Sequence, residues 1–305
     1  MACTVLNGRS IAAIGIATSR SSGRVDVRDT KTGYLIGEPQ TEFGSRVTAV
    51  ACTVLDGHPL AIIGAGGRVY SQDVATGRPI GEPLTGLQGQ VSALTCTVLD
   101  ERPLAIIGAS HTRDGVGRVY VRDVATGDLM GEPLSGFNNE VTAMACTELD
   151  GRPVAVIGSG TGSKGGNRRV DVRDVATGHP IGEPLTELPG RVYALSCTVL
   201  DERPVAVVGA GGRAYVQDVA TGRCTGSLLT GRHGWVSSVT CTILDGRPLA
   251  VISAGSTLGV WDLRPRKLME HFVVPSLAQA AVADDGSLVV SLKRDVAVFR
   301  RTGTG

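Results

Sequence analysis

An all-β fold is predicted by three features of this 305-residue sequence. The phrase Cys-Thr-x-Leu recurs at separations of 49, 44, 50, 51 and 44 residues. Each copy holds β-branched and aliphatic runs, such as Val47–Leu55 and Pro59–Ala65, which are typical of strands buried on both faces. Turn-forming pairs such as Asp56-Gly57 separate these runs. Four short antiparallel strands at a period of about 45 residues predict a seven-bladed β-propeller.

The whole chain, residues 1–305, is expected to form one domain made of seven blades. The first blade begins inside its own first strand at Met1, and a degraded seventh copy begins near Gln279. The expected blades are 1–46, 47–90, 91–140, 141–191, 192–235, 236–276 and 277–305.

Each blade reads as four strands with recognisable turns. The Asp-Gly pair between the first two strands tolerates the positive φ of a type I′ turn. The third strand, Arg68–Asp73 in the second blade, ends on an aspartate just before an Ala-Thr-Gly turn. The fourth strand is expected at the outer edge, since proline cannot donate to a ladder. Its prolines are Pro39, Pro83, Pro133 and Pro184.

The end of the third strand resembles the WD40 family, and the resemblance covers essentially the whole chain. The family's Trp-Asp pair stands literally at Trp261-Asp262, and other copies keep only the aspartate. Its Gly-His pair is missing, so the resemblance implies a propeller that lacks the family's Asp–His hydrogen bonds in most blades. The phrase Asp-Val-Ala-Thr-Gly, followed by Gly-Glu-Pro-Leu, is similar to bacterial tandem WD40 arrays. That similarity implies a binding scaffold within a larger bacterial signalling protein.

Composition and charge narrow the class of partner. A net charge of +1 argues against nucleic acid and membrane surfaces as partners. The N-terminus lacks the pattern of a signal peptide, and no apolar run approaches the roughly 18 residues of a membrane helix. Six of the seven cysteines recur with the repeat and are interpreted as small buried hydrophobes, with metal or redox chemistry as the alternative. Reduced thiols without a signal peptide predict a cytoplasmic protein.

One face of the predicted ring varies between the copies, and we expect protein or peptide partners to bind there. The loops between second and third strands, and between blades, change in length and chemistry, whereas the turns of the opposite face recur nearly unchanged. Variation on one face of a repeat protein is typical of a binding surface, with neutral drift as the alternative. The candidate residues are Arg20, Phe43, His111, Arg113, Asp114, Phe137, Asn138, Lys164, Arg168, His233 and Trp235.

An arginine begins the third strand in five copies, at the variable-face end. One interpretation is a ring of guanidinium groups around the channel mouth that holds an anionic partner. The alternative is structural, with each arginine paired to an aspartate or carbonyl of the next blade. The residues are Arg24, Arg68, Arg118, Arg169 and Arg213.

Catalytic and cofactor motifs are missing, so we expect no enzyme activity and no cofactor. The segment Gly160–Gly165 matches G-x-G-x-x-G, but it lies in a predicted hairpin loop, where no phosphate cradle forms. The five histidines are scattered, without metal-ligand spacing. Two alternatives stay open: a propeller that binds carbohydrate or another small ligand, and a hydrolase or lyase with its site at the channel mouth.

The last blade is expected to lack its outer strand, giving 27 strands where a complete ring has 28. The edge Asp295–Arg301 would then accept another strand, from a partner or a second copy. Met1-Ala-Cys-Thr matches Met144-Ala-Cys-Thr inside the fourth copy. We therefore expect this chain to be the C-terminal part of a longer protein, whose upstream segment resembles Gly-Glu-Pro-Leu-Thr-Gly and completes the blade.

Overall fold

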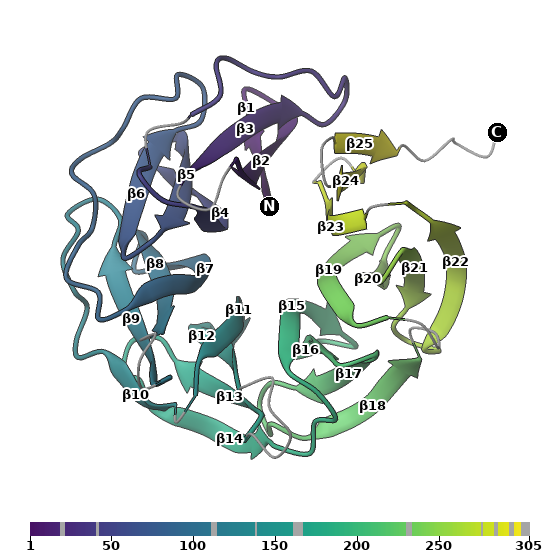
Figure 1. Ribbon diagram of the computed structural model, residues 1–305. Coiled ribbons are helices and arrows are strands. Elements are labelled where there is room, and N and C mark those ends of the chain that lie inside the picture. The colour runs from purple at the N-terminus through teal and green to yellow at the C-terminus, as the bar shows by residue number, and fades with distance from the viewer. Residues whose placement is uncertain are drawn as a thin grey trace.

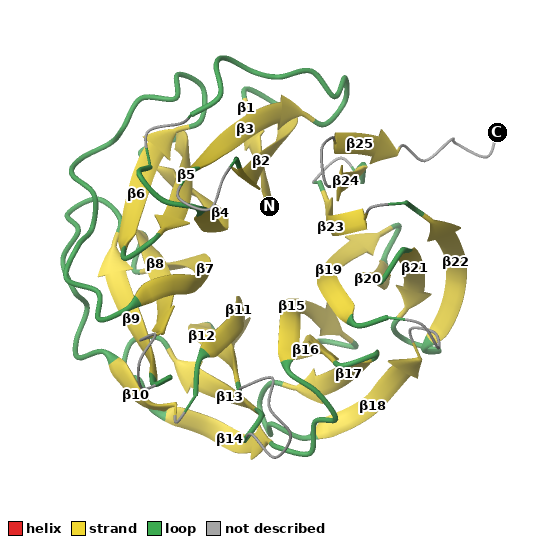
Figure 2. Cartoon of the chain, viewed as in Figure 1, coloured by secondary structure: helices red, strands yellow, loops and turns green. Residues whose placement is uncertain are grey.

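The computed structural model confirms the predicted all-β propeller, with seven antiparallel sheets arranged around one axis (Figure 1). The structure describes residues 1–18, 22–40, 43–110, 115–137, 139–160, 167–229, 234–275, 277–283, 286–292 and 296–299. Figure 2 shows strands joined by loops, and the described residues contain no helix. Accordingly, no helix in the described part of the chain is suited to crossing a membrane.

Blades 3 to 6 each contain four strands in the described residues. Blade 3 has β7 (Gln90–Leu99), β8 (Arg102–Ser110), β9 (Gly117–Asp123) and β10 (Leu134–Phe137). Blade 4 has β11 (Val141–Leu149), β12 (Arg152–Ser159), β13 (Arg169–Asp174) and β14 (Pro180–Leu185). Blade 5 has β15 (Val192–Leu200), β16 (Arg203–Ala210), β17 (Arg213–Asp218) and β18 (Cys224–Leu229). Blade 6 has β19 (Val236–Leu244), β20 (Arg247–Ala254), β21 (Thr257–Asp262) and β22 (Lys267–Val273).

Blades 1, 2 and 7 each form a three-stranded sheet. Blade 1 has β1 (Ala2–Leu6), β2 (Arg9–Ala17) and β3 (Gly23–Asp29). Blade 2 has β4 (Val47–Leu55), β5 (His58–Ala65) and β6 (Arg68–Asp73). Blade 7 has β23 (Leu277–Val282), β24 (Leu288–Leu292) and β25 (Val296–Phe299).

The predicted count of 27 strands is too high, because the outer segments of blades 1 and 2 form isolated bridges instead of ladders. Gln40 and Leu35 bridge to β3, and Leu84 and Pro79 bridge to β6. A proline and a positive-φ glycine lie in each segment and weaken the pairing, although β14 contains the same two features and still pairs with β13. The described residues therefore contain 25 strands, while the three-stranded last blade agrees with the prediction.

The first hairpin of blades 1 to 6 turns as the sequence predicts. Asp56 and Gly57 have φ values of 50° and 78°, as a type I′ turn requires. In blades 3 and 5 a glutamate takes the glycine's place, and Glu101 still adopts a φ of 61°. The first strand of each blade lies innermost, and neighbouring first strands contact one another around the axis (Figure 1).

A valine of blades 2 to 6 packs against a glycine of the preceding blade. A methyl group placed on Gly108 of β8 would lie 2.6 Å from Cγ1 of Val141, which begins the first strand of the next blade. The same arrangement joins four further pairs of blades, so the bare backbone of a glycine receives a fully or partly buried valine at five of the seven seams. These further pairs are Gly15 with Val47, Gly64 with Val91, Gly158 with Val192 and Gly209 with Val236.

The seam between blades 7 and 1 has a smaller core than the others. Ala12, Ile14 and Val289 are its buried members, with partly buried side chains such as Met1 and Ile16 packed around them. The amino group of Met1 donates to Oε1 of Gln279 at 3.3 Å. Side-chain packing of these inner strands closes the ring.

We expect Gly108→Ala to destabilise the protein by about 1–3 kcal/mol, because the added methyl overlaps Val141. Equilibrium unfolding in urea measures this change. The matched control is Gly226→Ala on outer strand β18, where the new methyl meets the movable guanidinium of Arg266. Equal effects of the two substitutions would show that the contact between glycine and valine does not hold the seam.

Candidate interaction site on the variable face

The first strand of blades 2 to 7 carries a β-bulge at its variable-face end. In blade 4 the pairing register between β11 and β12 shifts between Val141 and Ala143, so Thr142 is the extra residue. The shift recurs directly after one residue near the start of five other first strands: Val47, Val91, Val192, Val236 and Leu277. A bulge bends its strand and redirects side chains, so these positions present side chains at the mouth of the ring.

In four of these blades the bulge residue has a hydroxyl that binds its own blade. Thr142 donates to the carbonyl of Gly158 at 3.1 Å, and this acceptor is the glycine that receives the next blade's valine. Ser92 donates in the same way to Gly108 at 3.2 Å. The Thr48 hydroxyl lies 3.2 Å from the carbonyl of Gly64 and closer, at 2.7 Å, to the carbonyl of Val91 in the next blade. In blade 6, Ser237 donates to Ser253 at 3.4 Å. The bulge hydroxyl is therefore a structural feature of the repeat.

Blade 5 departs from this rule, because Tyr193 occupies the bulge position. Its ring stacks on Trp235 of the next seam, with the ring centroids 5.5 Å apart and the planes 23° from parallel. Trp235 is 68% exposed. A stacked aromatic pair at the surface provides apolar area together with polar edges, which is the composition of many protein-binding sites.

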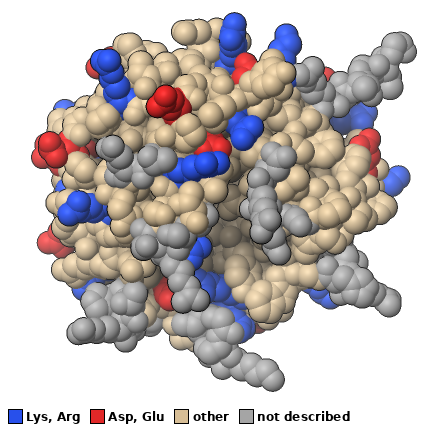
Figure 3. All heavy atoms as spheres, turned by 45° about the horizontal axis from the view of Figure 1, so that its top comes forward, with Lys and Arg blue, Asp and Glu red and all other residues tan. Residues whose placement is uncertain are grey.

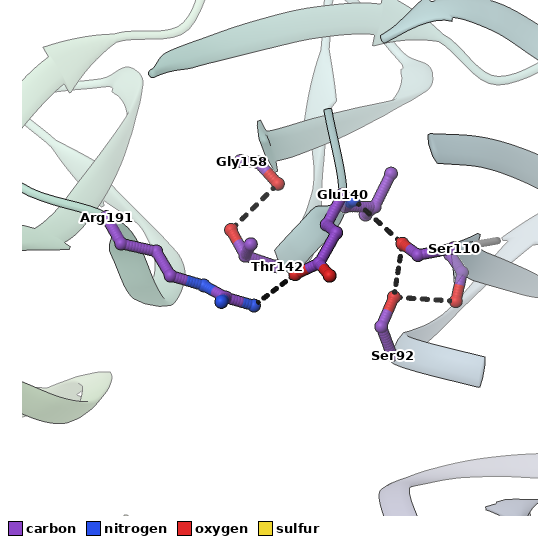
Figure 4. A network of polar contacts seen from close by, with 8 residues as sticks. Ser92, Ser110, Glu140, Thr142, Gly158 and Arg191 are labelled. Atoms are coloured by element: carbon purple, nitrogen blue, oxygen red, sulfur yellow. Dashed lines mark hydrogen bonds and ion pairs between the residues drawn. The ribbon is translucent and has the colours of Figure 1, made fainter. Parts of the chain in front are cut away.

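A charged pair extends this aromatic pair across the neighbouring seam. The guanidinium of Arg191 lies 5.9 Å from the centre of the Tyr193 ring, and its Nη2 lies 2.9 Å from Oε2 of Glu140 (Figure 4). Both members of the ion pair are partly exposed, so it is available to a partner and contributes little to stability. Glu140, Arg191, Tyr193 and Trp235 thus form one connected strip over blades 4 to 6.

Serines beneath Glu140 position the start of its strand. Oγ of Ser110 accepts a hydrogen bond from the backbone N–H of Val141 at 3.1 Å, and Ser92 lies 3.3 Å from the same hydroxyl (Figure 4). Next to them is a hollow of about 420 Å³. Its lining comes from Arg46, Val47, Thr48, Gln90, Val91, Ser92, Ser110 and Glu140.

We define the mouth strip as Arg46, Gln90, Glu140, Arg191, Tyr193 and Trp235. All of these except Tyr193 immediately precede the seam valine of their blade, and Tyr193 follows its valine. The sequence analysis selected only Trp235 from this set. Comparing the copies at this one register position would have shown Arg, Gln, Glu, Arg and Trp in succession.

Two of the predicted binding residues, Phe43 and Phe137, are buried, so the prediction that they are exposed to a partner is wrong. Phe43 is 3% exposed and packs edge-on against Tyr70, whose hydroxyl donates to the Phe43 carbonyl at 3.0 Å. Phe137 is 1% exposed and lies under the guanidinium of Arg173. Both rings fill the seam between blades, so the loops that carry them fold inward.

The other predicted loop residues divide into two groups. Trp235 is exposed as expected, and Arg168 is partly exposed beside Asn167, whose carbonyl accepts a hydrogen bond from Asn139 at 2.8 Å. The remaining candidates lie outside the described residues: Arg20, His111, Arg113, Asp114, Asn138, Lys164 and His233.

The predicted arginine ring does not surround the channel mouth, because third strands lie two strands away from the axis (Figure 1). Arg24 pairs with the buried Asp26 at 3.0 Å, and Arg169 hydrogen-bonds the buried Asp171. These partners lie two residues along the same strand, not in the next blade as the structural alternative proposed. The remaining arginines of the set, Arg68, Arg118 and Arg213, are exposed or partly exposed.

Tyrosine replaces the buried aspartate in three blades, and in two of them it bonds across the seam. The hydroxyl of Tyr70 donates to the Phe43 carbonyl, whereas the hydroxyl of Tyr120 accepts a hydrogen bond from the N–H of Gln88 at 2.9 Å. Both tyrosines thus join a third strand to the preceding inter-blade loop.

The cysteines of the repeat are free thiols in partly buried positions on the inner strands. Burial raises the pKa of Cys146 and Cys241 to about 12 and raises the pKa of Cys96 and Cys197 well above the ordinary value. These four thiols remain protonated at neutral pH, which opposes metal binding and nucleophilic attack. Among the described residues, no three His, Cys, Asp or Glu side chains gather as a metal site.

Charges of both signs are mixed on the surface. Figure 3 shows Lys and Arg interspersed with Asp and Glu on the side that it presents, without a continuous field of one sign. This distribution agrees with the net charge of +1. It favours partners recognised by local contacts over partners attracted by a large field.

Comparison with known proteins supports the fold. No protein-family model matches the chain, and no curated protein matches it significantly in sequence. Among solved structures, a chain in the crystal structure of a mitotic checkpoint complex is similar, with a TM-score of 0.75 and 18% sequence identity. The match covers 96% of this chain and 87% of the other. At this identity the similarity shows a common propeller fold and nothing finer.

We expect alkylation at pH 8 to separate the thiols by environment. Exposed Cys224 should react with iodoacetamide more than about 100-fold faster than Cys96, Cys146, Cys197 and Cys241, because few of the buried thiols ionise. Mass spectrometry of the digested protein measures the labelling rates, and labelling in guanidinium chloride is the control. Rapid labelling of a repeat cysteine in the folded protein would contradict the assignment.

Proposed function

We propose that this chain is a non-catalytic protein-interaction scaffold that binds protein or peptide partners through the mouth strip. The fold supports the coarse part of this statement, since β-propellers commonly serve as interaction scaffolds. One observation carries the finer part. Tyr193 replaces a structural hydroxyl of the repeat and builds an exposed stack with Trp235.

The cost of that replacement favours a role in binding. In other blades the Thr or Ser at the bulge donates a hydrogen bond to a carbonyl of the second strand. Blade 5 lacks this hydroxyl because Tyr193 occupies the position. A buried apolar contact does not compensate, since Tyr193 is only partly buried and Trp235 is largely exposed. Exposed Trp, Tyr and Arg are the residue types that dominate binding energy at protein interfaces.

The ion pair beside the aromatic pair gives the site polar specificity. Arg191 and Glu140 reach the surface from successive blades, and each retains exposed atoms that can meet a partner's charged groups. Such pairs at the rim of an interface contribute to partner choice and association rate more than to affinity. The aromatic pair supplies the anchor, and the charges around it select the partner.

Two finer features of the proposal rest on sequence resemblance. The Trp261-Asp262 pair and the repeated Asp-Val-Ala-Thr-Gly phrase support WD40-type ancestry and a place within a bacterial signalling protein. A cytoplasmic location belongs to the same proposal and follows from the free thiols.

We expect Tyr193→Ser with Trp235→Ala to weaken partner binding strongly while leaving the fold intact. The serine restores the hydroxyl that the other blades use, and removing an exposed Trp does not open a core cavity. Loss of two such anchors should weaken binding at least about 30-fold. Affinity capture from the native host, quantified by mass spectrometry, measures partner recovery.

The control variant is Val199→Thr with Ile243→Thr, which alters exposed residues at the opposite end of the first strands. Partners of the mouth strip should be recovered equally by this control and by the wild type. If the control loses the partners and the Tyr193 variant retains them, the opposite face is the binding surface and the proposal fails.

A further inference from the structure

Blade 7 ends at its third strand in the described residues, and β25 is the outer strand of that sheet. Blades 4, 5 and 6 instead continue to β14, β18 and β22, which form an outer arc (Figure 1). A fourth strand in blade 7 would make the contacts that the outer strands make in the other blades. This edge lies on the third strand of its blade, whereas the mouth strip lies at the innermost first strands, so the two surfaces can be tested independently.

A fourth strand normally covers a turn glycine of the next blade. Cδ2 of Leu84, in the outer segment of blade 2, lies 2.9 Å from where a methyl on Gly127 of blade 3 would stand. Leu134 of blade 3 approaches Gly178 of blade 4 in the same way, at 2.6 Å, and Gln40 approaches Gly77 at 3.1 Å. The outer strand is therefore part of the seam.

Gly33 is the equivalent glycine of blade 1, and it lacks this cover. No heavy atom of the described residues lies within 4 Å of the position that a methyl on Gly33 would take. The strand that would cover it is the fourth strand of blade 7. The surface over Gly33 is thus shaped like one that receives a leucine at the other seams.

An apolar groove lies on the other side of the same edge. Its volume is about 430 Å³, and it runs between blades 6 and 7. Met269 and Phe272 of β22 and Phe299 of β25 line it while 45%, 41% and 45% exposed. In blade 4, where the outer strand is present, large apolar side chains pack against the core instead. Ile181 and Leu185 of β14 are examples.

The outer segments of blades 1 to 4 indicate the chemistry of the missing strand. Those of blades 2, 3 and 4 share the sequence Ile/Met-Gly-Glu-Pro-Leu at residues 80–84, 130–134 and 181–185, and Ile36–Gln40 of blade 1 differs only at its last position, whereas β18 and β22 do not carry the motif. The first residue of the motif donates its N–H to the third strand, as Ile80 does to Ser71 and Met130 does to Val121, both at 2.8 Å. Val298 occupies the equivalent position in β25, because it pairs with Val289 as Val172 pairs with Val156.

We infer that the edge of β25 binds an extended segment of a partner polypeptide, with the pattern apolar-Gly-Glu-Pro-Leu, as the fourth strand of blade 7. Its first apolar residue donates to the carbonyl of Val298, and its leucine covers Gly33. A second copy of this chain cannot supply the segment. Each such segment here is already held in its own blade, through Ile36, Ile80, Met130 and Ile181. Addition of a strand to a sheet edge is an established mode of peptide recognition.

The probe is a labelled peptide of residues 78–86, Arg-Pro-Ile-Gly-Glu-Pro-Leu-Thr-Gly, added to the intact chain. Fluorescence anisotropy should show saturable binding of the peptide. Thermal unfolding should show that the bound peptide raises the Tm of the chain. Two altered peptides test the geometry. One has aspartate at the position of Leu84, and the other has an N-methyl group at Ile80 that removes the donor. Both should bind at least tenfold more weakly.

Protein variants locate the binding. Phe299→Ser and Phe272→Ser, at exposed positions, should each weaken binding at least tenfold without loss of the fold, whereas Trp235→Ala on the mouth strip should leave it unchanged. Absence of binding at about 1 mM peptide would overturn the inference. So would equal binding of the N-methyl peptide, or a dimer of the chain that Phe299→Ser abolishes, since the occupant would then be a second copy.

Discussion

At five of the seven seams of this ring, a valine methyl packs on the bare backbone of a glycine in the preceding blade. The valine begins a first strand, and the glycine lies in the second strand of the preceding blade, as Val192 and Gly158 do. Because no Cβ intervenes, the two sheets approach closely enough for their aliphatic faces to share one core. The buried clusters accordingly contain residues of two neighbouring blades.

The bulge beside that valine connects packing to surface chemistry. The bulge adds one residue to the first strand directly after the valine. In four blades this extra residue is Ser or Thr, and its hydroxyl donates to the carbonyl of a glycine or serine in the second strand of the same blade. The residues on either side of the valine are left at the mouth of the ring. These flanking residues can vary without disturbing the seam. Variable residues therefore lie directly beside the uniform seam valine. In blade 5 the bulge residue is Tyr193, and its ring stacks on Trp235.

The fold was predictable because it depends on local patterns that repeat. Aliphatic runs, Asp-Gly turns and an edge proline specify strands and their order without knowledge of distant contacts. The inward orientation of Phe43 and Phe137 was not predictable, because it depends on how an inter-blade loop packs against Tyr70 or Arg173. Glu140 and Arg191 also escaped detection as a pair, since they are 51 residues apart and meet only through the closure of adjacent blades.

The glycine and valine contact is tested most directly by a double-mutant cycle at Gly158 and Val192. If the valine methyl occupies the space that a Cβ at Gly158 would fill, Gly158→Ala should be strongly destabilising in the wild type and nearly neutral beside Val192→Ala. The coupling free energy measured by urea unfolding should then be at least about 1 kcal/mol. Additive effects of the two substitutions would contradict the account, because they would show that the seams are held by something other than this contact.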